Sequence, residues 1–296
     1  PYRSLKSNDD QDLNQRIFFY GYTHPELGRV LFPDFIPSDL EIHDDYVVGK
    51  ETDLLVVGMH KKKSNNFPHF KGIVLYVNGE SYGSITPGIE NNKYMIGCIP
   101  RHEKHYLQIY YISIAALSLP PNTLTNLVKP SRSIQRPFNF LLYIASNCIR
   151  HRESMFDTLS LLKTVHFMKG NCHGSFLNQN KTSIPSTDRN KWWNNAKLYN
   201  QFRFALVMEN TVRSGYITEK ILNAFVGGSI PIYYGTTEIF NVFNYKSFIF
   251  YDPLQPEIAL NKINYLEQNA TAYLEMKRQS IFVNDSLHQY FSLFTS

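Results

Sequence analysis

The first half of the chain alternates short apolar runs with polar and turn-forming segments. Each run has the length of a strand and is rich in β-branched or aromatic residues. The runs lie at Ile17–Tyr20, Leu54–Val57, Ile73–Val77 and Tyr94–Ile99. Because strands separated by helical or loop segments are typical of α/β proteins, this half is predicted to form an α/β domain.

A proline-rich stretch, Ser118–Pro137, interrupts this pattern. It contains four prolines and shows no clear period. Because proline removes a backbone donor and blocks both helices and inner strands, we expect an interdomain linker here. The expected domains are residues 1–133 and residues 134–296, with the last helix as a candidate for return to the N-terminal domain.

The second half begins with a near-continuous apolar run, which is typical of a strand buried on both faces. A helix follows, and then a strand, a helix with a Gly-Gly end and another strand form a predicted βαβ unit before a mostly helical tail. In order, these segments are Phe138–Ala145, Glu153–Leu162, Phe202–Met208, Ile217–Val226 closed by Gly227-Gly228, Ile230–Tyr234 and Pro256–Phe282. Ligands of open α/β sheets bind outside the carboxyl ends of the strands, which directs attention to Ser146–Arg152 and Glu209–Lys220.

Composition and charge narrow the functional classes. Hydrophobic residues make up 43% of the chain, which excludes global disorder. The net charge of +5 suits an anionic ligand such as a nucleotide diphosphate, but it is too small and too dispersed to indicate nucleic acid. No apolar stretch reaches the roughly 20 residues of a membrane helix, and the chain opens without a signal peptide. We therefore expect membrane association only through a segment absent from this sequence.

The three cysteines, Cys98, Cys148 and Cys172, lie far apart and form no C-x-x-C pair. This spacing predicts neither a disulfide framework nor a zinc site, and it favours a reducing, cytoplasmic location. Three N-glycosylation sequons instead favour a location in the secretory pathway. A Golgi-lumen location is the alternative if an N-terminal anchor was removed.

The segment Glu209–Lys220 joins a strand end to the start of a predicted helix, where free N–H groups and a partial positive charge favour phosphate. Lys220 adds a full positive charge, Glu219 suits hydrogen bonds from ribose hydroxyls, and Tyr216 offers a ring or a hydroxyl to a nucleotide. The alternative is ordinary, because an acidic residue in a first helical turn is common and a Glu-Lys pair can simply be solvated.

Other candidate residues have equally ordinary alternatives. Arg152, just past a predicted strand, can bind a phosphate bidentately or form a surface salt bridge. Glu80, at another strand end, can be a general base or one more surface carboxylate. The only D-x-D is Asp10-Gln11-Asp12 in a polar stretch, and no P-loop, dinucleotide or nucleophile-elbow motif occurs. The sequence therefore indicates no metal site.

Three segments of the second half together resemble the signature of the α1,3-fucosyltransferases, glycosyltransferase family 10. They are Phe204–Asn210 (FALVMEN), Gly215–Ile221 (GYITEKI) and Gly228–Gly235 (GSIPIYYG). Ala145-Ser146-Asn147 followed by Arg152 resembles the family's strand-end Ser-Asn and its phosphate-binding arginine. Tyr76–Ser81 (YVNGES) looks like the segment that carries the family's proposed catalytic base, and the resemblance extends from about Ile73 to Tyr251.

The resemblance implies an α/β protein of the GT-B fold, with two Rossmann-like domains facing across a cleft. The N-terminal domain is then on the acceptor side, and the C-terminal domain binds GDP-fucose through Arg152, Asn210, Tyr216, Glu219 and Lys220. Glu80 is implied as the catalytic base of an inverting transfer of L-fucose from GDP-β-L-fucose to an oligosaccharide hydroxyl. The expected acceptor atom is O3 of GlcNAc in an N-acetyllactosamine-like glycan. No cofactor, essential metal or nucleic-acid partner is expected.

Two other functions remain open at this point. Another GT-B sugar-nucleotide transferase would also hold a diphosphate at a helix N-terminus, without needing Tyr216 and Glu219-Lys220 in this context. A non-catalytic carbohydrate-binding protein would use its 21 Phe and 20 Tyr residues to stack on sugars. Competition between sugar nucleotides separates the first alternative, and turnover of GDP-fucose decides against the second.

Overall fold

The computed structural model describes residues 16–20, 36–41, 50–51, 53–58, 70–78, 93–101, 104–116, 119, 122–128, 136–169, 180–184, 195–284 and 286–291. The chain divides into two compact units. The first comprises Pro1–Asn78, Tyr82–Ile96 and His102–Leu107, and the second comprises Gly79–Ser81, Gly97–Arg101 and Gln108–Ser296. The described residues from 108 to 128 therefore group with the second unit, ahead of the boundary expected after residue 133.

The first sheet has six strands in the order β2-β1-β3-β4-β5-β6. Its strands are β1 (Arg16–Tyr20), β2 (Ile36–Glu41), β3 (Leu54–Gly58), β4 (Ile73–Asn78), β5 (Lys93–Gly97) and β6 (Tyr106–Gln108). The strands from β1 to β4 pair in parallel. Alternate residues of β3 and β4, such as Leu55 and Val74, are buried in one core. The four strands predicted from apolar runs are confirmed, whereas β2, which carries a proline, and the three-residue β6 were not predicted.

The second sheet also has six strands, in the order β12-β11-β10-β7-β8-β9, and they pair in parallel. They are β7 (Asn139–Ala145), β8 (Val165–Lys169), β9 (Lys181–Ser183), β10 (Phe202–Met208), β11 (Ile230–Tyr234) and β12 (Ile249–Phe250). The chain builds outward from β7 to β9 on one side, then returns to β10 and builds outward on the other. The strand order therefore reverses between β7 and β10, which is where open α/β sheets bind ligands.

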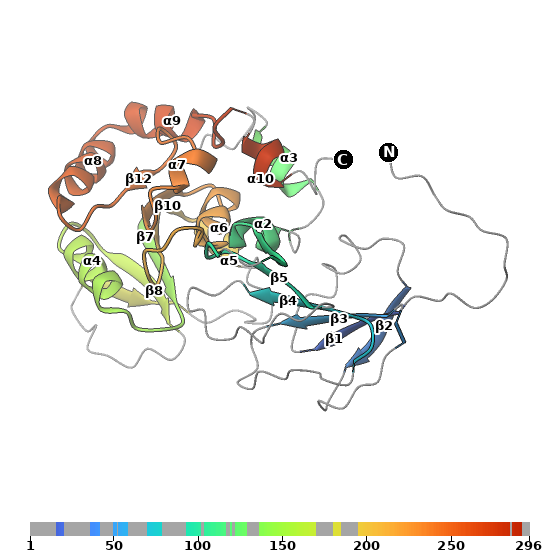
Figure 1. Cartoon of the computed structure of the whole chain (residues 1–296). Helices are drawn as coiled ribbons and strands as arrows, with labels where there is room; N and C mark the ends of the chain where they lie inside the picture. The colour runs from blue at the N-terminus through green and yellow to red at the C-terminus, as the bar shows by residue number, and fades with distance from the viewer. Residues whose placement is uncertain are drawn as a thin grey trace. The chain divides into compact units, whose positions relative to one another are not determined.

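Helices cover both faces of this second sheet (Figure 1). They are α2 (Tyr111–Ala116), α3 (Thr123–Val128), α4 (Arg150–Ser160), α5 (Asn195–Tyr199), α6 (Lys220–Val226), α7 (Ile239–Val242), α8 (Pro256–Gln268), α9 (Ala270–Arg278) and α10 (Ser286–Phe291). Phe204 and Leu206 of β10 lie in one core with α4, α8 and α9, whereas Ala205 and Val207 lie in the other with α5 and α6. The central strands are thus buried on both faces, which explains why their sequences are continuously apolar.

The structure confirms most of the predicted elements in this unit and corrects two. β7, α4, β10, β11 and the helical tail lie where the sequence pattern predicts them. The proline-rich stretch is not an unstructured linker throughout, because it contains the short helix α3. The helix predicted from Ile217 begins at Lys220 instead.

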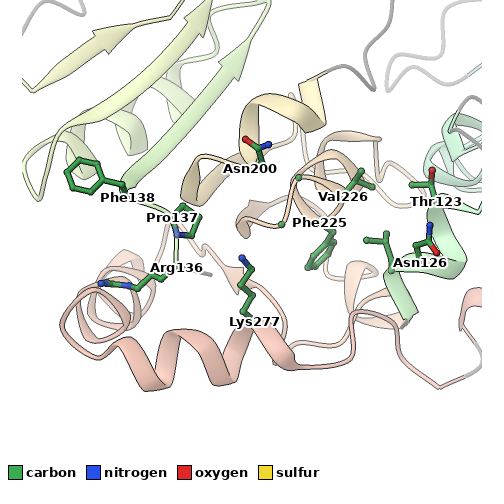
Figure 2. Close-up of a pocket in the computed structure, with 12 residues that line it drawn as sticks. Thr123, Asn126, Arg136, Pro137, Phe138, Asn200, Phe225, Val226 and Lys277 are labelled. Atoms are coloured by element: carbon green, nitrogen blue, oxygen red, sulfur yellow. The ribbon is translucent and has the colours of Figure 1, made fainter. Parts of the chain in front are cut away.

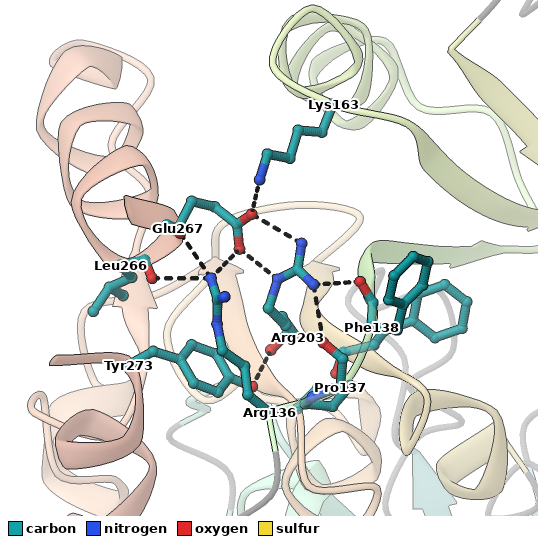
Figure 3. Close-up of polar contacts among 10 residues, drawn as sticks. Arg136, Pro137, Phe138, Lys163, Arg203, Leu266, Glu267 and Tyr273 are labelled. Carbon is teal, nitrogen blue, oxygen red and sulfur yellow. Dashed lines mark hydrogen bonds and ion pairs between the residues drawn. The ribbon is translucent and has the colours of Figure 1, made fainter. Parts of the chain in front are cut away.

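A buried carboxylate fastens the end of α8 to the amino ends of β7 and β10 (Figure 3). The side chain of Glu267 is only 5% exposed, and it pairs with Arg203, Lys163 and Arg136. Arg203 Nη2 donates to Glu267 Oε2 over 2.9 Å, and Arg203 Nη1 donates to the carbonyl of Pro137 over 2.9 Å. Burial favours the neutral form of Glu267, but hydrogen bonds from Arg203 and Lys163 lower its pKa below the usual value. This network stabilises the sheet at the amino ends of β7 and β10, opposite the carboxyl ends of the strands.

Candidate active site at the carboxyl ends of β7, β10 and β11

Polar residues converge where β7, β10 and β11 end, next to the point at which the strand order reverses. Glu209 and Asn210 directly follow β10, and His151 and Arg152 lie in the first turn of α4 after β7. The backbone N–H of Glu209 donates to the carbonyl of Tyr234 at the end of β11 over 2.8 Å. His151 Nε2 donates to the carbonyl of Glu209 over 3.0 Å, and its ring lies 4.7 Å from that of Tyr234. The three strand ends are therefore tied into one cluster.

Arg152 is buried, with 2% of its surface exposed, so the interpretation as a surface salt bridge is wrong. Its Nη1 donates to Asn210 Oδ1 over 2.9 Å, and its Nη2 donates to the carbonyl of Asn147. These partners are neutral, and buried Nε has no hydrogen-bond partner in the described part of the chain. A buried cation that lacks a carboxylate partner is costly unless a ligand supplies negative charge. The positive charge of Arg152 therefore favours the binding of an anion at this site.

Glu209 carries the most enclosed carboxylate of the cluster, with no exposed surface. Its Oε1 accepts from the backbone N–H of Thr218 over 2.8 Å, and the Thr218 hydroxyl lies 2.9 Å from both carboxylate oxygens. Sequence reasoning did not select Glu209 as a functional residue. The one available signal was an acidic residue placed immediately after a strand buried on both faces.

Lys220, at the start of α6, pairs with this carboxylate. Its Nζ lies 3.1 Å from Glu209 Oε2 and donates to the Thr218 hydroxyl over 2.8 Å. Burial alone would lower the pKa of Lys220, but Glu209 and then Glu219 raise it above the usual value, so the side chain stays charged. An ammonium group has three N–H donors. The third N–H donor of Lys220 has no hydrogen-bond partner among the described residues, and 25% of the side chain is exposed.

The other predicted donor-binding residues occupy different environments. Asn210 is half-buried and accepts from Arg152, which fixes the orientation of its amide. Tyr216 is only 3% exposed, so its ring does not stand open to a ligand. Glu219 is half-buried and makes no side-chain hydrogen bond within the described residues. Glu80 lies outside the described residues, so its role stays a prediction.

The loop between β10 and α6 is held by both geometry and hydrogen bonds. Gly215 has a φ of +78°, and a Cβ atom there would lie 1.7 Å from the carbonyl oxygen of Cys98. Its backbone N–H donates to Glu238 Oε2 over 2.6 Å, and the Ser214 hydroxyl also donates to Glu238. A side chain at position 215 would therefore displace the loop that leads to Tyr216 and Lys220.

A pocket of about 860 Å³ lies near the amino ends of strands β7, β10 and β11, opposite the carboxyl ends where the polar cluster lies (Figure 2). Pro137 and Phe138 precede β7, Asn200 precedes β10 and Gly228 precedes β11, and all four line it together with Lys277. Open parallel sheets bind ligands at the carboxyl ends of their strands. This pocket therefore does not belong to the polar cluster described above.

Two further structural findings bear on predictions from the sequence. Cys148, three residues after β7, is disulfide-bonded, although the cysteine spacing predicted no disulfide framework. Within the described ranges, no group of three or more His, Cys, Asp or Glu residues could hold a metal ion.

A helix long and apolar enough to cross a membrane is absent from the part of the chain that the structure describes.

Sequence comparisons find relatives for the second half of the chain. Residues 136–280 match the family described as "Glycosyltransferase family 10 (fucosyltransferase) C-term". An "Alpha-(1,3)-fucosyltransferase FucT" of Helicobacter pylori is 39% identical over 84 residues, which are 28% of this chain and 18% of that protein. An "Alpha-(1,4)-fucosyltransferase" of Arabidopsis thaliana is 30% identical over 104 residues, which are 32% of this chain and 25% of that protein. These alignments thus span about a quarter or less of each relative's length.

Structural comparisons extend over nearly the whole chain. A crystal structure of an α1,3-fucosyltransferase with GDP-fucose has a TM-score of 0.60 at 18% identity, covering 94% of this chain and 85% of that one. The structure of Anabaena Alr3699/HepE in complex with UDP-glucose has a TM-score of 0.58 at 10% identity, covering 95% and 96%. At these identities the likeness shows the fold, which is that of the GT-B glycosyltransferases and confirms the predicted fold class.

Proposed function

We propose that this protein is an inverting α1,3-fucosyltransferase that uses GDP-β-L-fucose as its donor, because residues 136–280 match the model of glycosyltransferase family 10. The observation that carries the proposal is a pair of cations at the reversal point of the second sheet. Arg152 and Lys220 contact the consecutive residues Asn210 and Glu209, and each keeps at least one N–H group without a hydrogen-bond partner among the described residues. Two such cations suit a diphosphate, which carries negative charge on both phosphates.

In this proposal the cations stabilise the leaving group. As the bond between fucose C1 and the phosphate oxygen breaks, its electron pair stays with GDP, and charge builds on the diphosphate. Lys220 and Arg152 act on that charge, and they need no reorganisation because Glu209, Thr218 and Asn210 already hold them in place. Glu219, which directly precedes Lys220 in the chain, is proposed to accept hydrogen bonds from the ribose hydroxyls.

The acceptor half of the proposal rests on Glu80. Its carboxylate takes the proton of an acceptor hydroxyl, whose oxygen forms the new bond to C1 on the face opposite GDP. The configuration at C1 is thereby inverted, from β in the donor to α in the product. The proposed acceptor atom is O3 of GlcNAc in an N-acetyllactosamine-like glycan, and the 3-linkage agrees with the name of the H. pylori relative. A 4-linked product is the alternative, because the Arabidopsis relative is named for that linkage.

A donor panel tests this function against its closest rival. The protein is incubated with a mixture of oligosaccharide acceptors and one of GDP-fucose, GDP-mannose, UDP-glucose or UDP-galactose, and release of the nucleoside diphosphate is followed. We expect acceptor-dependent release from GDP-fucose and little from the others. Preference for a UDP-sugar would instead support another GT-B transferase, the class to which the UDP-glucose-bound structural neighbour points. Binding of glycans without any nucleotide release would indicate a carbohydrate-binding protein.

A further inference from the structure

We propose that Glu209 is a positioning residue, which holds the Lys220 ammonium and the loop before α6 in the geometry that a donor diphosphate requires. The inference rests on the proposed function, since it takes Lys220 as a diphosphate ligand. Glu209 itself has no exposed surface, so it acts through its neighbours and does not contact the donor. What supports the proposal is the division of its hydrogen bonds between backbone, hydroxyl and ammonium.

The Thr218 hydroxyl connects the carboxylate to the ammonium. It lies 2.9 Å from both oxygens of Glu209, and Lys220 Nζ lies 2.8 Å from it. Because the ammonium can only donate, the Thr218 hydroxyl accepts from Lys220 and gives its own proton to Glu209. The three groups thus form a closed set in which the ammonium uses two donors, and the direction of its third N–H is fixed.

The carboxylate also fixes the backbone ahead of α6. Glu209 Oε1 accepts from the backbone N–H of Thr218 over 2.8 Å, so the chain between β10 and α6 returns to its own strand end. The carbonyl of Ile217 accepts from the backbone N–H of Ile112 over 2.8 Å and not from a residue further along its own helix. This agrees with a helix that begins at Lys220.

The charge of Glu209 offsets the cost of burying Lys220. Among the described residues, the titratable groups that interact electrostatically with this ammonium are the carboxylates of Glu209 and Glu219 and the hydroxyls of Tyr216 and of Tyr199 on α5. Among them only Glu209 is hydrogen-bonded to Nζ. Without this carboxylate, burial would favour the neutral amine, and a neutral amine would no longer attract a diphosphate.

The test measures GDP affinity as a function of pH in Glu209→Gln, which keeps the side chain's size and removes its charge. In the wild type Lys220 stays protonated from about pH 8 to pH 10, so the GDP affinity of each variant is expressed relative to that of the wild type at the same pH, which cancels the ionisation of guanine in this range. In Glu209→Gln, affinity should be roughly 10-fold weaker at pH 8, and it should fall further as pH rises and Lys220 deprotonates. Glu275→Gln, which changes an exposed carboxylate on α9, is the matched control and should match the wild type.

A second substitution separates positioning from simple destabilisation. The double variant Glu209→Gln/Lys220→Arg should regain a flat pH profile, because arginine does not deprotonate in this range. Glu209→Asp keeps the charge on a shorter side chain, so it should bind GDP more weakly but without pH dependence. This variant keeps the proposal testable if the Gln variant does not fold. A weakened but flat profile in Glu209→Gln, or a sloping one in Glu209→Asp, would overturn the proposal.

The same measurements distinguish this inference from the proposed function. If Lys220→Ala binds GDP as tightly as the wild type, Lys220 is not a diphosphate ligand, and the proposed function loses its main support. If Lys220→Ala loses affinity while Glu209→Gln keeps wild-type affinity at every pH, the donor site stands and only the positioning role of Glu209 is refuted.

Discussion

At the scale of single residues, Lys220 combines a fixed position with an unused hydrogen-bond donor. Replacing it with alanine removes one charge-assisted contact to the proposed diphosphate, which is worth about 1.5–3 kcal/mol. We therefore expect calorimetry to show GDP affinity lowered by roughly 10- to 150-fold in Lys220→Ala. Lys246→Ala, which changes an exposed lysine, should bind normally. Equal affinity of the two variants would contradict the assignment, and a thermal melt of each checks that the fold is kept.

Glu80 carries the prediction that depends most on the family resemblance. Glu80→Gln keeps the side chain's size and removes the proton acceptor, so turnover should fall by roughly 10²–10⁴-fold. GDP affinity should change little, because the proposed phosphate ligands belong to other parts of the chain. A small loss of turnover with a raised acceptor KM would make Glu80 an acceptor-binding residue, and wild-type turnover would move the base to another carboxylate.

At the residue scale, the sequence predicts site residues correctly where the residues that act together are neighbours in the chain. The proximity of Glu219 and Lys220 is visible in the chain, and so is the position of Arg152 after a strand. Glu209 was missed because its burial depends on Thr218 and Lys220 folding back onto the end of β10. The neutral partners of Arg152 were not predictable either, since Asn210 lies 58 residues away along the chain.

At the scale of secondary-structure elements, the Glu267 network joins α8 to the starts of β7 and β10 (Figure 3). Removing one partner of a buried ion pair leaves the remaining charge uncompensated, at a cost of about 3–5 kcal/mol. We therefore expect Glu267→Gln to lower the free energy of unfolding at pH 7 by an amount of this order. Glu275→Gln, with an exposed carboxylate, should change it little.

The pH dependence of this effect follows from the lowered pKa of Glu267. Above its ordinary value of 4.5 the carboxylate is charged in both the folded and the unfolded chain, so the stabilisation is fully present. As pH falls through the lower folded-state pKa, Glu267 is protonated and the stabilisation is lost. The difference in unfolding free energy between the wild type and Glu267→Gln should therefore shrink below about pH 4. A difference that is constant with pH would show that the ion pairs are not its cause.

The elements that the sequence predicted share a physical feature. β7, β10 and β11 are buried on both faces, so almost every position must be apolar and the strand is visible as a continuous run. β9 and β6 have three residues each, and α3 has six residues within a proline-rich stretch, so no periodicity could develop. Their conformations depend on tertiary contacts that a local pattern does not contain.

At the scale of the whole molecule, leaving-group stabilisation is proposed to come from basic side chains and not from a metal ion. Two basic groups, Arg152 and Lys220, are proposed to do what a divalent metal does in other sugar-nucleotide transferases. We expect fucosyl transfer to survive dialysis against EDTA with its rate nearly unchanged. If the rate instead falls to zero and returns only with manganese or magnesium, the proposed roles of these cations are wrong.

The GT-B fold by itself does not choose the donor, because structural neighbours with GDP-fucose and with UDP-glucose match the chain almost equally well. The choice depends on the match of residues 136–280 to the family 10 model and on the cluster at the carboxyl ends of β7 and β10. The activity that needs testing is therefore the proposed transfer of fucose with inversion.

Time-resolved proton NMR of the reaction tests that proposal most directly. The protein is mixed with GDP-β-L-fucose and an N-acetyllactosamine acceptor, and the anomeric signals of donor and product are followed together. We expect the β-anomeric signal of the donor to decay as the signal of a fucoside α-linked to O3 of GlcNAc grows, with matching release of GDP. An unchanged donor, or a product that retains the β configuration, would contradict the proposal.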